Sequence, residues 1–424
     1  MSRTLSFIRD AAWLNGERAR AYSLMVSWAF AAMFAWIIYS HLFIYTGTGD
    51  PLGGDFVSFY AASKLALAGH AADAWRPALH GAAEDSLFKG SHGYLAFFYP
   101  PPYVLVCWPL ALLPYPVALI TWIIATLAVA VVTIKLFFRQ ITPDLYVGAL
   151  VLLAFPGVWI NMGCGQNGAL TLALFALGFA IIEKRPLVAG LVLGGLVIKP
   201  QFAAALPFVL GAAALIRPAL WKAFFASAFS AAMLCLVTFA LVGPEGYAAF
   251  FANSTYARET LSRGLVDPAI MQSLYAALRV FQVPMMAAYG AQVLLSATVI
   301  GAASYIAWKH KTDGPALGAL AVSATLLATP FMLDYDLLIC ALPMGWLVIS
   351  GAKSGAHPWE KLVALIVFIL PLFSRKLAML YHAPVAPLVL LALFVMVARR
   401  IMAGQTEAVS PVPSWKTPPA EVLP

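Results

Sequence analysis

The segment YSLMVSWAFAAMFAWIIYSHLFI, residues 22–44, decides the fold class of this chain. It contains no Asp, Glu, Lys or Arg, and it exceeds the roughly 20 apolar residues that a helix needs to cross a bilayer. Comparable apolar runs recur as far as Arg399, and the chain is 62% hydrophobic and only 10% charged, whereas soluble domains are about one quarter charged. The sequence therefore predicts an all-α polytopic membrane protein. Long apolar runs, rather than weak alternation, exclude a β-barrel.

The charged residues predict how the chain is oriented in the membrane. The net charge is +8. In a membrane protein this excess is expected from basic cytoplasmic loops, so no nucleic-acid partner is predicted. With the basic clusters inside, about 12 helices cross the membrane and both termini are cytoplasmic, provided that residues 96–114 enter the membrane edge without crossing. The clusters are Lys135/Arg139, Lys184/Arg185, Arg217/Lys222, Lys309/Lys311, Lys353/Lys361 and Arg399/Arg400.

The chain is organised as one membrane domain, predicted for residues 1–402, in a membrane of the bacterial inner-membrane type. Residues 403–424 are rich in proline and polar groups, and we expect them to form a disordered cytoplasmic tail. In the segment GLVLGGL, Gly190 and Gly194 share one helix face, which favours close packing against another helix.

The cysteines and histidines do not predict a metal site or a cofactor. The four cysteines are far apart in sequence and lie in or beside apolar segments, which is typical of buried thiols. The histidines of the expected external segments show no spacing typical of metal ligands; they are His70, His80, His92 and His382.

Five polar motifs fall on the external side of the predicted topology, although they are distant in sequence. Such convergence is expected of a site that loops build around a membrane-facing cavity. The motifs are GGDF (53–56), YPPP (99–102), GCGQNG (163–168), IKPQ (198–201) and PFMLDYDLL (330–338).

Asp55 follows two glycines, which let the backbone turn sharply and bring its carboxylate close to a ligand. One hypothesis is a general base at the boundary of water and lipid, where partial desolvation would raise its pKa. The alternative is a helix N-cap, for which Asp is a preferred residue. The residues alone favour neither.

Two lysines lie where a lipid-linked phosphate could bind, and the polar Gln201 beside one of them is a candidate for sugar or acceptor binding. Lys199 stands between two short apolar spans, where a lysine is costly unless it is paired. We interpret Lys199 as a phosphate-binding cation, next to the polar Gln201; the alternatives are snorkelling to the interface or a structural ion pair. Lys64 is a second candidate for the phosphate, although an ordinary solvated lysine is the simpler interpretation.

The remaining candidates are sugar-binding or acceptor-binding groups. Gln166 and Asn167 could hydrogen-bond sugar hydroxyls or simply form a turn. Asp334 and Asp336 flank one tyrosine, so in a helix at most one of them would face the cavity, where it could pair with Lys199, assist the base or bind a metal. Tyr99 and the prolines that follow it, at positions 100–102, could shape a lipid groove or break a helix.

Taken in order, the motifs GGDFVSFYAASKLALAG, YPPPYVLVCWPLALLP, GQNGALTLALFALGF, AGLVLGGLVIKPQ and DYDLL resemble those of glycosyltransferase family 87. The resemblance covers residues 50–340. It implies a GT-C-type fold with short juxtamembrane helices in the first external loop. An acidic residue of that loop would be the catalytic base, and Asp55 is the matching position. The family includes polyprenol-phosphate-mannose-dependent mannosyltransferases.

The predicted function is therefore an inverting hexosyltransferase. A hexose, expected to be mannose, would move from a polyprenyl-phosphate donor to a glycolipid or glycan acceptor at the external face, among membrane lipids. The alternative is a secondary transporter or lipid flippase without transferase activity. That class favours internal repeats and charges near span midpoints, neither of which we recognise in this sequence.

Overall fold

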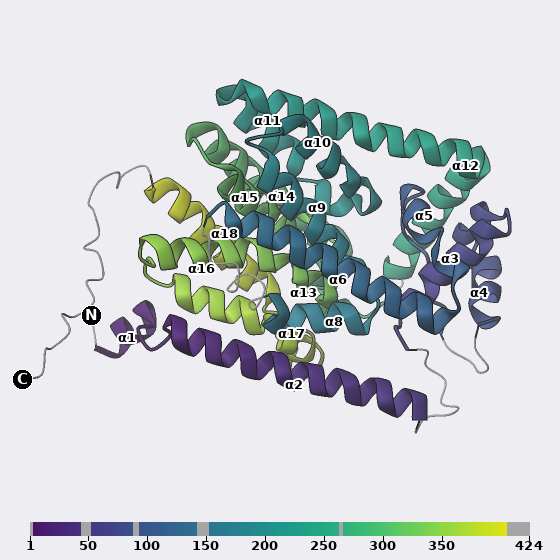
Figure 1. Cartoon of the computed structure of the whole chain (residues 1–424), viewed down its shortest axis with the longest axis horizontal. Coiled ribbons are helices and arrows are strands. Elements are labelled where there is room, and N and C mark those ends of the chain that lie inside the picture. Colours follow the sequence, from purple (N-terminus) through teal and green to yellow (C-terminus); the bar gives the residue numbers. More distant parts are fainter. Residues whose placement is uncertain (1–2, 44–51, 88–92, 142–151, 263–265, 405–424) are drawn as a thin grey trace, which may run out of the picture.

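The computed structural model describes residues 3–43, 52–87, 93–141, 152–262 and 266–404, and they are predominantly helical (Figure 1). The all-α prediction is confirmed; across these ranges the strand-type pairing is a single bridge between Met271 and Leu333. Most of the predicted tail, residues 405–424, lies outside the described residues.

Seven helices in these ranges are long and apolar enough to cross a bilayer. They are α2 (Gly16–Phe43), α6 (Tyr115–Arg139), α12 (Trp221–Ser262), α14 (Met285–Lys309), the continuous η7 (Asp334–Cys340) and α16 (Ala341–Ser354), α17 (Glu360–Tyr381) and α18 (Ala386–Ala403). The other apolar helices are shorter, so the predicted count of about 12 spans stays a prediction.

Two of the shorter helices lie in the interior of the bundle. All of α15 (Gly314–Ala328) is buried, and α9 (Gly168–Ile181) is buried along most of its length. The others are α1 (Arg3–Asp10), α8 (Pro156–Gly163), α10 (Pro186–Gly194), η3 (Gly195–Ile198), η4 (Pro200–Ala203), α11 (Leu206–Ile216), η5 (Pro218–Leu220), η6 (Pro268–Ile270) and α13 (Leu274–Val280).

Close packing of α10 against α12 depends on two glycines. A Cβ atom on Gly190 would collide with the carbonyl oxygen of Ala223, and one on Gly194 would lie 2.5 Å from the carbonyl oxygen of Ser227. The prediction of close helix packing at these glycines is confirmed, because only a hydrogen atom fits between the two backbones.

Short helices gather at one end of the bundle, on the right in Figure 1. They are α3 (Phe56–Leu67), η1 (Ala71–Trp75), α4 (Pro77–Asp85), α5 (Pro102–Cys107) and η2 (Leu110–Leu112). The last two belong to the proline-rich segment that was expected not to cross the membrane, and each is far too short to do so alone. Whether residues 96–114 as a whole cross stays a prediction.

Helix α3 is fixed to this proline-rich segment by hydrogen bonds and aromatic packing. The hydroxyl of Tyr60 donates to the carbonyl of Leu113 at 2.8 Å, and the hydroxyl of Ser63 donates to the carbonyl of Trp108 at 2.8 Å. The buried face of α3 packs in an aromatic cluster with the neighbouring segments; its members include Phe56, Phe59, Trp75, Phe97, Tyr103 and Trp122. The first turn of α3 is therefore held rigidly, which matters for the residue that precedes it.

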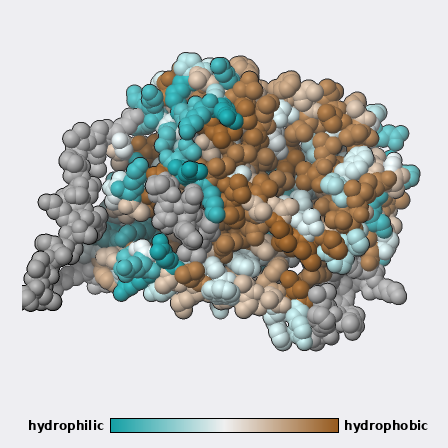
Figure 2. Space-filling view, viewed as in Figure 1, coloured by the Kyte–Doolittle hydropathy of each residue, from teal (hydrophilic) through white to brown (hydrophobic). Residues whose placement is uncertain are grey.

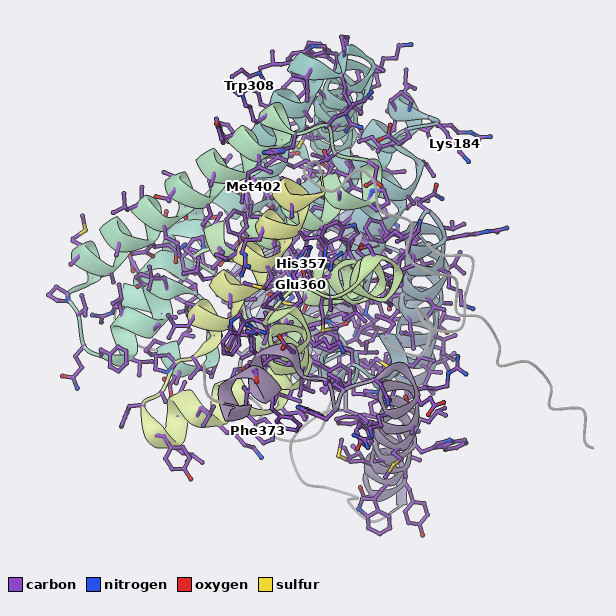
Figure 3. All side chains as sticks on the ribbon, turned by 90° about the vertical axis from the view of Figure 1, so that its left-hand side faces the viewer. Lys184, Trp308, His357, Glu360, Phe373 and Met402 are labelled. Atoms are coloured by element: carbon purple, nitrogen blue, oxygen red, sulfur yellow. The ribbon has the colours of Figure 1, made fainter. Side chains whose placement is uncertain are left out.

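The surface has an apolar middle and polar ends. Figure 2 shows brown side chains across the centre, and teal ones gathered at the left and along parts of the right edge. Figure 3 looks onto the left-hand end, where Lys184 projects from the loop between α9 and α10. Basic side chains at the ends of α6, α11, α14 and α16 follow the same pattern, opposite to α3; they are Arg139, Arg217, Lys309 and Lys353.

Candidate active site

Asp55 stands immediately before α3, at the end of a turn made by Gly53 and Gly54. Both glycines have positive φ angles, +93° and +43°, which few other residues adopt. A Cβ atom on Gly165 would lie 2.8 Å from the carbonyl oxygen of Gly53, so the two glycine-rich turns touch. This contact brings Asp55 beside Gln166.

The carboxylate of Asp55 does not cap its own helix. It forms no side-chain hydrogen bond with the first turn of α3, which argues against the N-cap interpretation. Instead its Oδ2 accepts a hydrogen bond from Nε2 of Gln166 at 2.5 Å. The residue remains partly exposed, so the carboxylate is held by the protein and still open to a ligand.

Gln166 is itself held in one orientation. Its Oε1 accepts hydrogen bonds from the hydroxyl of Tyr99 at 2.8 Å and from the backbone N–H of Asn167 at 3.2 Å. With the oxygen end occupied by two donors, the amide nitrogen must point toward Asp55. Gln166 thus serves as a positioning residue for the carboxylate.

The pKa of Asp55 is raised above its ordinary value, mainly because the surrounding protein removes water from the carboxyl group. The hydrogen bond from Gln166 and the positive charge of Lys199 act in the opposite direction. A carboxylate with a raised pKa is a stronger base than one in water.

Lys199 lies at the centre of the site, after η3, and is only 3% exposed. Its Nζ donates to Oδ1 of Asp336 at 2.6 Å and to Oδ1 of Asn167 at 3.0 Å. The rings of Tyr99, Phe202 and Tyr335 lie 5.3–5.9 Å from the same nitrogen. Of the interpretations given above, these contacts favour the structural ion pair.

The two aspartates of the DYD segment have separate partners. Asp336 pairs with Lys199, whereas Asp334 accepts from the backbone of Tyr335 at 3.0 Å and lies 3.5 Å from Nη1 of Arg375. Tyr335, between them, is buried, and its ring lies 5.4 Å from Nζ of Lys199. The expectation that at most one aspartate faces the central cluster agrees with this geometry.

Two predicted site residues lie outside this cluster. Lys64 is exposed near the end of α3, where its Nζ donates to the hydroxyl of Ser86 at 3.0 Å. Gln201 is partly buried in η4, and its backbone carbonyl accepts from the hydroxyl of Thr329 at 2.8 Å.

Tyr335 and Arg375 are the site residues that our sequence reasoning did not select. The signal for Tyr335 was its place between two acids in a 3-10 segment, where three consecutive side chains point in different directions. Arg375 lies on α17 and approaches Asp334 only through tertiary packing. Within the described ranges, no three His, Cys, Asp or Glu side chains gather so that they could hold a metal ion.

This architecture defines a class: a polytopic helical membrane protein with a carboxylate site beside short helices, at the end opposite the basic ends of α6, α11, α14 and α16 (Figure 1). The profile of glycosyltransferase family 87 matches residues 97–330, more than half of the chain. The chain therefore belongs to glycosyltransferase family 87, and it is an integral membrane glycosyltransferase. No curated protein and no solved structure matches it. The matched residues include Tyr99, Gln166 and Lys199 but not Asp55.

Proposed function

We propose that this glycosyltransferase moves a hexose from a polyprenyl-phosphate donor to a hydroxyl group of a glycolipid or glycan acceptor, and that the hexose is mannose. The reaction inverts the anomeric centre, and Asp55 is the general base. The observation that carries the proposal is the Asp55 carboxylate: it is not used as a helix cap, is held by Gln166 and is partly exposed beside a buried cation.

The chemistry needs one base and no covalent intermediate. Asp55 takes the proton of the acceptor hydroxyl while that oxygen forms a bond to C1 of the donor sugar. The bond from C1 to the phosphate oxygen breaks, and the phosphate leaves with the electron pair. Attack from the opposite face inverts the configuration, as in inverting glycosidases, where one carboxylate activates the nucleophile. The raised pKa of Asp55 supports this role.

The leaving phosphate requires positive charge nearby. Lys199 already bonds Asp336 and Asn167, so a phosphate that bound it directly would have to replace one of them. We therefore propose that Lys199 acts on the donor phosphate through its electrostatic field and by ordering the site. Arg375, 49% exposed and only 3.5 Å from Asp334, is better placed to contact the phosphate of a lipid carrier. Lys64 has no support from this geometry.

We propose that the site faces the exterior of a bacterial-type inner membrane. The basic ends of α6, α11, α14 and α16 lie opposite to α3 (Figure 1), as expected if those ends are cytoplasmic. A lipid-linked donor would then present its sugar on the same side as Asp55.

The decisive experiment uses purified enzyme in nanodiscs with radiolabelled polyprenyl-phosphate-mannose and polyprenyl-phosphate-glucose, and with octyl glycosides as acceptors. Asp55→Asn preserves the hydrogen bond from Gln166 but removes the base, so turnover should fall on the order of 10²–10⁴-fold while donor binding persists. Asp85→Asn, at an exposed position of α4, is the matched control. Turnover near that of wild type in Asp55→Asn would refute the assignment, and NMR of the product tests inversion.

A further inference from the structure

The connection from α4 to α5 includes residues 93–100, which form neither helix nor strand. Backbone groups of such a segment need partners from elsewhere in the protein wherever they are shielded from water. One partner comes from α4, where Oε2 of Glu84 accepts a hydrogen bond from the N–H of Leu95 at 3.1 Å. Tyr99, at the end of the segment, contacts Gln166. The groups that hold this segment therefore also bear on the candidate active site.

Two buried donors hold the last residues of the segment. Nδ2 of Asn253 donates to the carbonyl of Phe97 at 2.9 Å. Nε1 of Trp75 donates to the carbonyl of Tyr99 at 2.8 Å. Asn253 and Trp75 are only 2% and 1% exposed, and a buried donor that loses its acceptor is costly. The backbone at Tyr99 therefore cannot shift far without breaking at least one of these bonds.

Asn253 reaches the segment because α12 breaks at Gly243. This residue has a φ angle of +67° and is followed by Pro244, so the second half of the helix turns back beside α5 and η1 (Figure 1). Trp75 comes to the same place because η1 packs on that second half, where its ring lies 6.3 Å from the ring of Phe250. Both donors thus belong to elements outside the candidate active site.

The hydrogen bonds continue from this segment to the carboxylate of Asp55. The hydroxyl of Tyr99 donates to Oε1 of Gln166, and Nε2 of Gln166 donates to Oδ2 of Asp55. The ring of Tyr99 also packs on Tyr103 and Phe59, with centroids 4.3 and 5.2 Å away. Ring packing limits where the side chain can lie. The bonds to its backbone hold the hydroxyl within the narrow range of distances and angles that a hydrogen bond requires.

We propose that Trp75 and Asn253 are positioning residues for the carboxylate of Asp55, because they keep the hydroxyl of Tyr99 on Gln166. The importance of this positioning for sugar transfer rests on the proposed function. When the hydroxyl is displaced, the amide of Gln166 is free to rotate and to turn its oxygen toward Asp55. An acceptor oxygen beside the carboxylate favours the protonated form, so less of the base is available at a given pH.

The kinetic test removes each donor and keeps a side chain of similar shape. Trp75→Phe and Asn253→Leu should each move the acidic limb of kcat/KM against pH upward by about 0.5 unit or more, the scale of one lost hydrogen bond. The donor KM should stay near that of wild type, because no donor-binding group changes. The controls are Trp308→Phe, at an exposed position of α14, and Thr255→Val, at an exposed position of the second half of α12. Neither control should shift the limb.

A double-mutant cycle separates positioning from general damage to the fold. In a Gln166→Leu background no amide remains to be oriented, so Trp75→Phe and Asn253→Leu should add no further shift. A shift of equal size in that background would show that both residues act through packing, and it would overturn the proposal. An unshifted limb in both single variants would overturn it as well.

A second readout needs no turnover. A water-soluble carbodiimide with glycine ethyl ester labels protonated carboxyl groups, and mass spectrometry of the Asp55 peptide then gives the pH dependence of labelling. This dependence should move upward in both single variants and not move further in the Gln166→Leu background. The ionisable side chains that interact electrostatically with Asp55 are the same in all these variants; they are Glu84, Tyr99, Cys164, Lys199, Tyr335 and Asp336.

The two readouts distinguish failure of this inference from failure of the proposed function. Transfer by Asp55→Asn at the wild-type rate contradicts the proposed function, and coupled shifts in labelling would still support the positioning. Loss of transfer in Asp55→Asn together with unshifted labelling in Trp75→Phe and Asn253→Leu contradicts the positioning alone. If the wild-type enzyme transfers no sugar, the labelling series decides by itself.

Discussion

Nε2 of Gln166 lies 2.5 Å from Oδ2 of Asp55, although 111 residues separate them in the chain. The glutamine belongs to the turn that precedes α9, and the aspartate to the turn that precedes α3. This hydrogen bond joins the interior of the bundle to the short helices around α3. It also predicts how the carboxylate of Asp55 responds to substitution.

Removing the Gln166 donor should shift the pH profile of the enzyme. The hydrogen bond stabilises ionised Asp55 and so lowers its pKa. Gln166→Leu should therefore raise the pKa of Asp55. Gln166→Glu should raise this pKa further, because two carboxylates would then share the site. Activity that needs deprotonated Asp55 would begin at a higher pH. The measurement is kcat/KM against pH, with Gln140→Leu, at an exposed position of the opposite end, as control. If the acidic limb of the pH profile is unshifted in both Gln166 variants, Gln166 does not stabilise ionised Asp55.

Removing one member of the buried ion pair of Lys199 and Asp336 should destabilise the fold more than removing both. Lys199→Met alone leaves a buried carboxylate without its cation, which typically costs about 3–5 kcal/mol. The double variant Lys199→Met/Asp336→Leu removes both charges and should recover much of the unfolding free energy while remaining inactive.

Thermal and denaturant unfolding in detergent would measure this cycle. Glu183→Gln breaks the more exposed 2.6 Å contact with Arg217 and should cost no more than about 1 kcal/mol. A double variant as unstable as Lys199→Met would show that the side chains matter through packing rather than through charge.

A second buried pair predicts a pH-dependent stability. His80 and Glu84 are fully buried on α4, with Nδ1 and Oε1 3.6 Å apart. Burial raises the pKa of Glu84 from 4.5 to about 7 and lowers the pKa of His80 to about 4. Since the fold prefers protonated Glu84, this contribution to stability is complete below pH 4.5 and is lost as the pH rises through 7.

Glu84→Gln mimics the protonated acid at every pH and keeps an acceptor for the backbone N–H of Leu95, now 3.1 Å from Oε2. The difference in Tm between this variant and wild type should therefore increase from pH 5 to pH 8. The contribution of His80 is common to both proteins and largely cancels. Glu17→Gln, at an exposed position of α2, should show no such trend. A constant difference would mean that Glu84 is ionised throughout this range.

Cysteine accessibility should report the proposed orientation. In a background without the four native cysteines, Glu245→Cys should react with a membrane-impermeant maleimide in intact cells, because position 245 lies beside η1 and α4, at the end that we propose faces the exterior. Lys184→Cys, at the opposite end, should react only after permeabilisation (Figure 3). Labelling of position 184 in intact cells would reverse the proposed topology.

Hydropathy and local turn chemistry made much of this protein predictable. Membrane insertion depends on the sum of side-chain transfer energies over about 20 neighbouring residues, so the all-α membrane class follows from the order of residues alone. The glycines before Asp55 and the small faces at Gly190 and Gly194 are also local signals, and the structure uses both. Polar motifs in an apolar chain identified most members of the central cluster.

The partners of those residues were decided only by tertiary structure. Lys199 and Asp336 are 137 residues apart, and no local pattern states which of several buried acids a lysine will meet. The same holds for Asp55, which binds Gln166 rather than its own helix, and for the break of α12 at Gly243. The sequence by itself determined which polar side chains cannot face the hydrocarbon of the bilayer. Packing of distant helices decided which of them meet, because hydrogen bonds and ion pairs depend on distances of a few ångströms that only the assembled bundle sets.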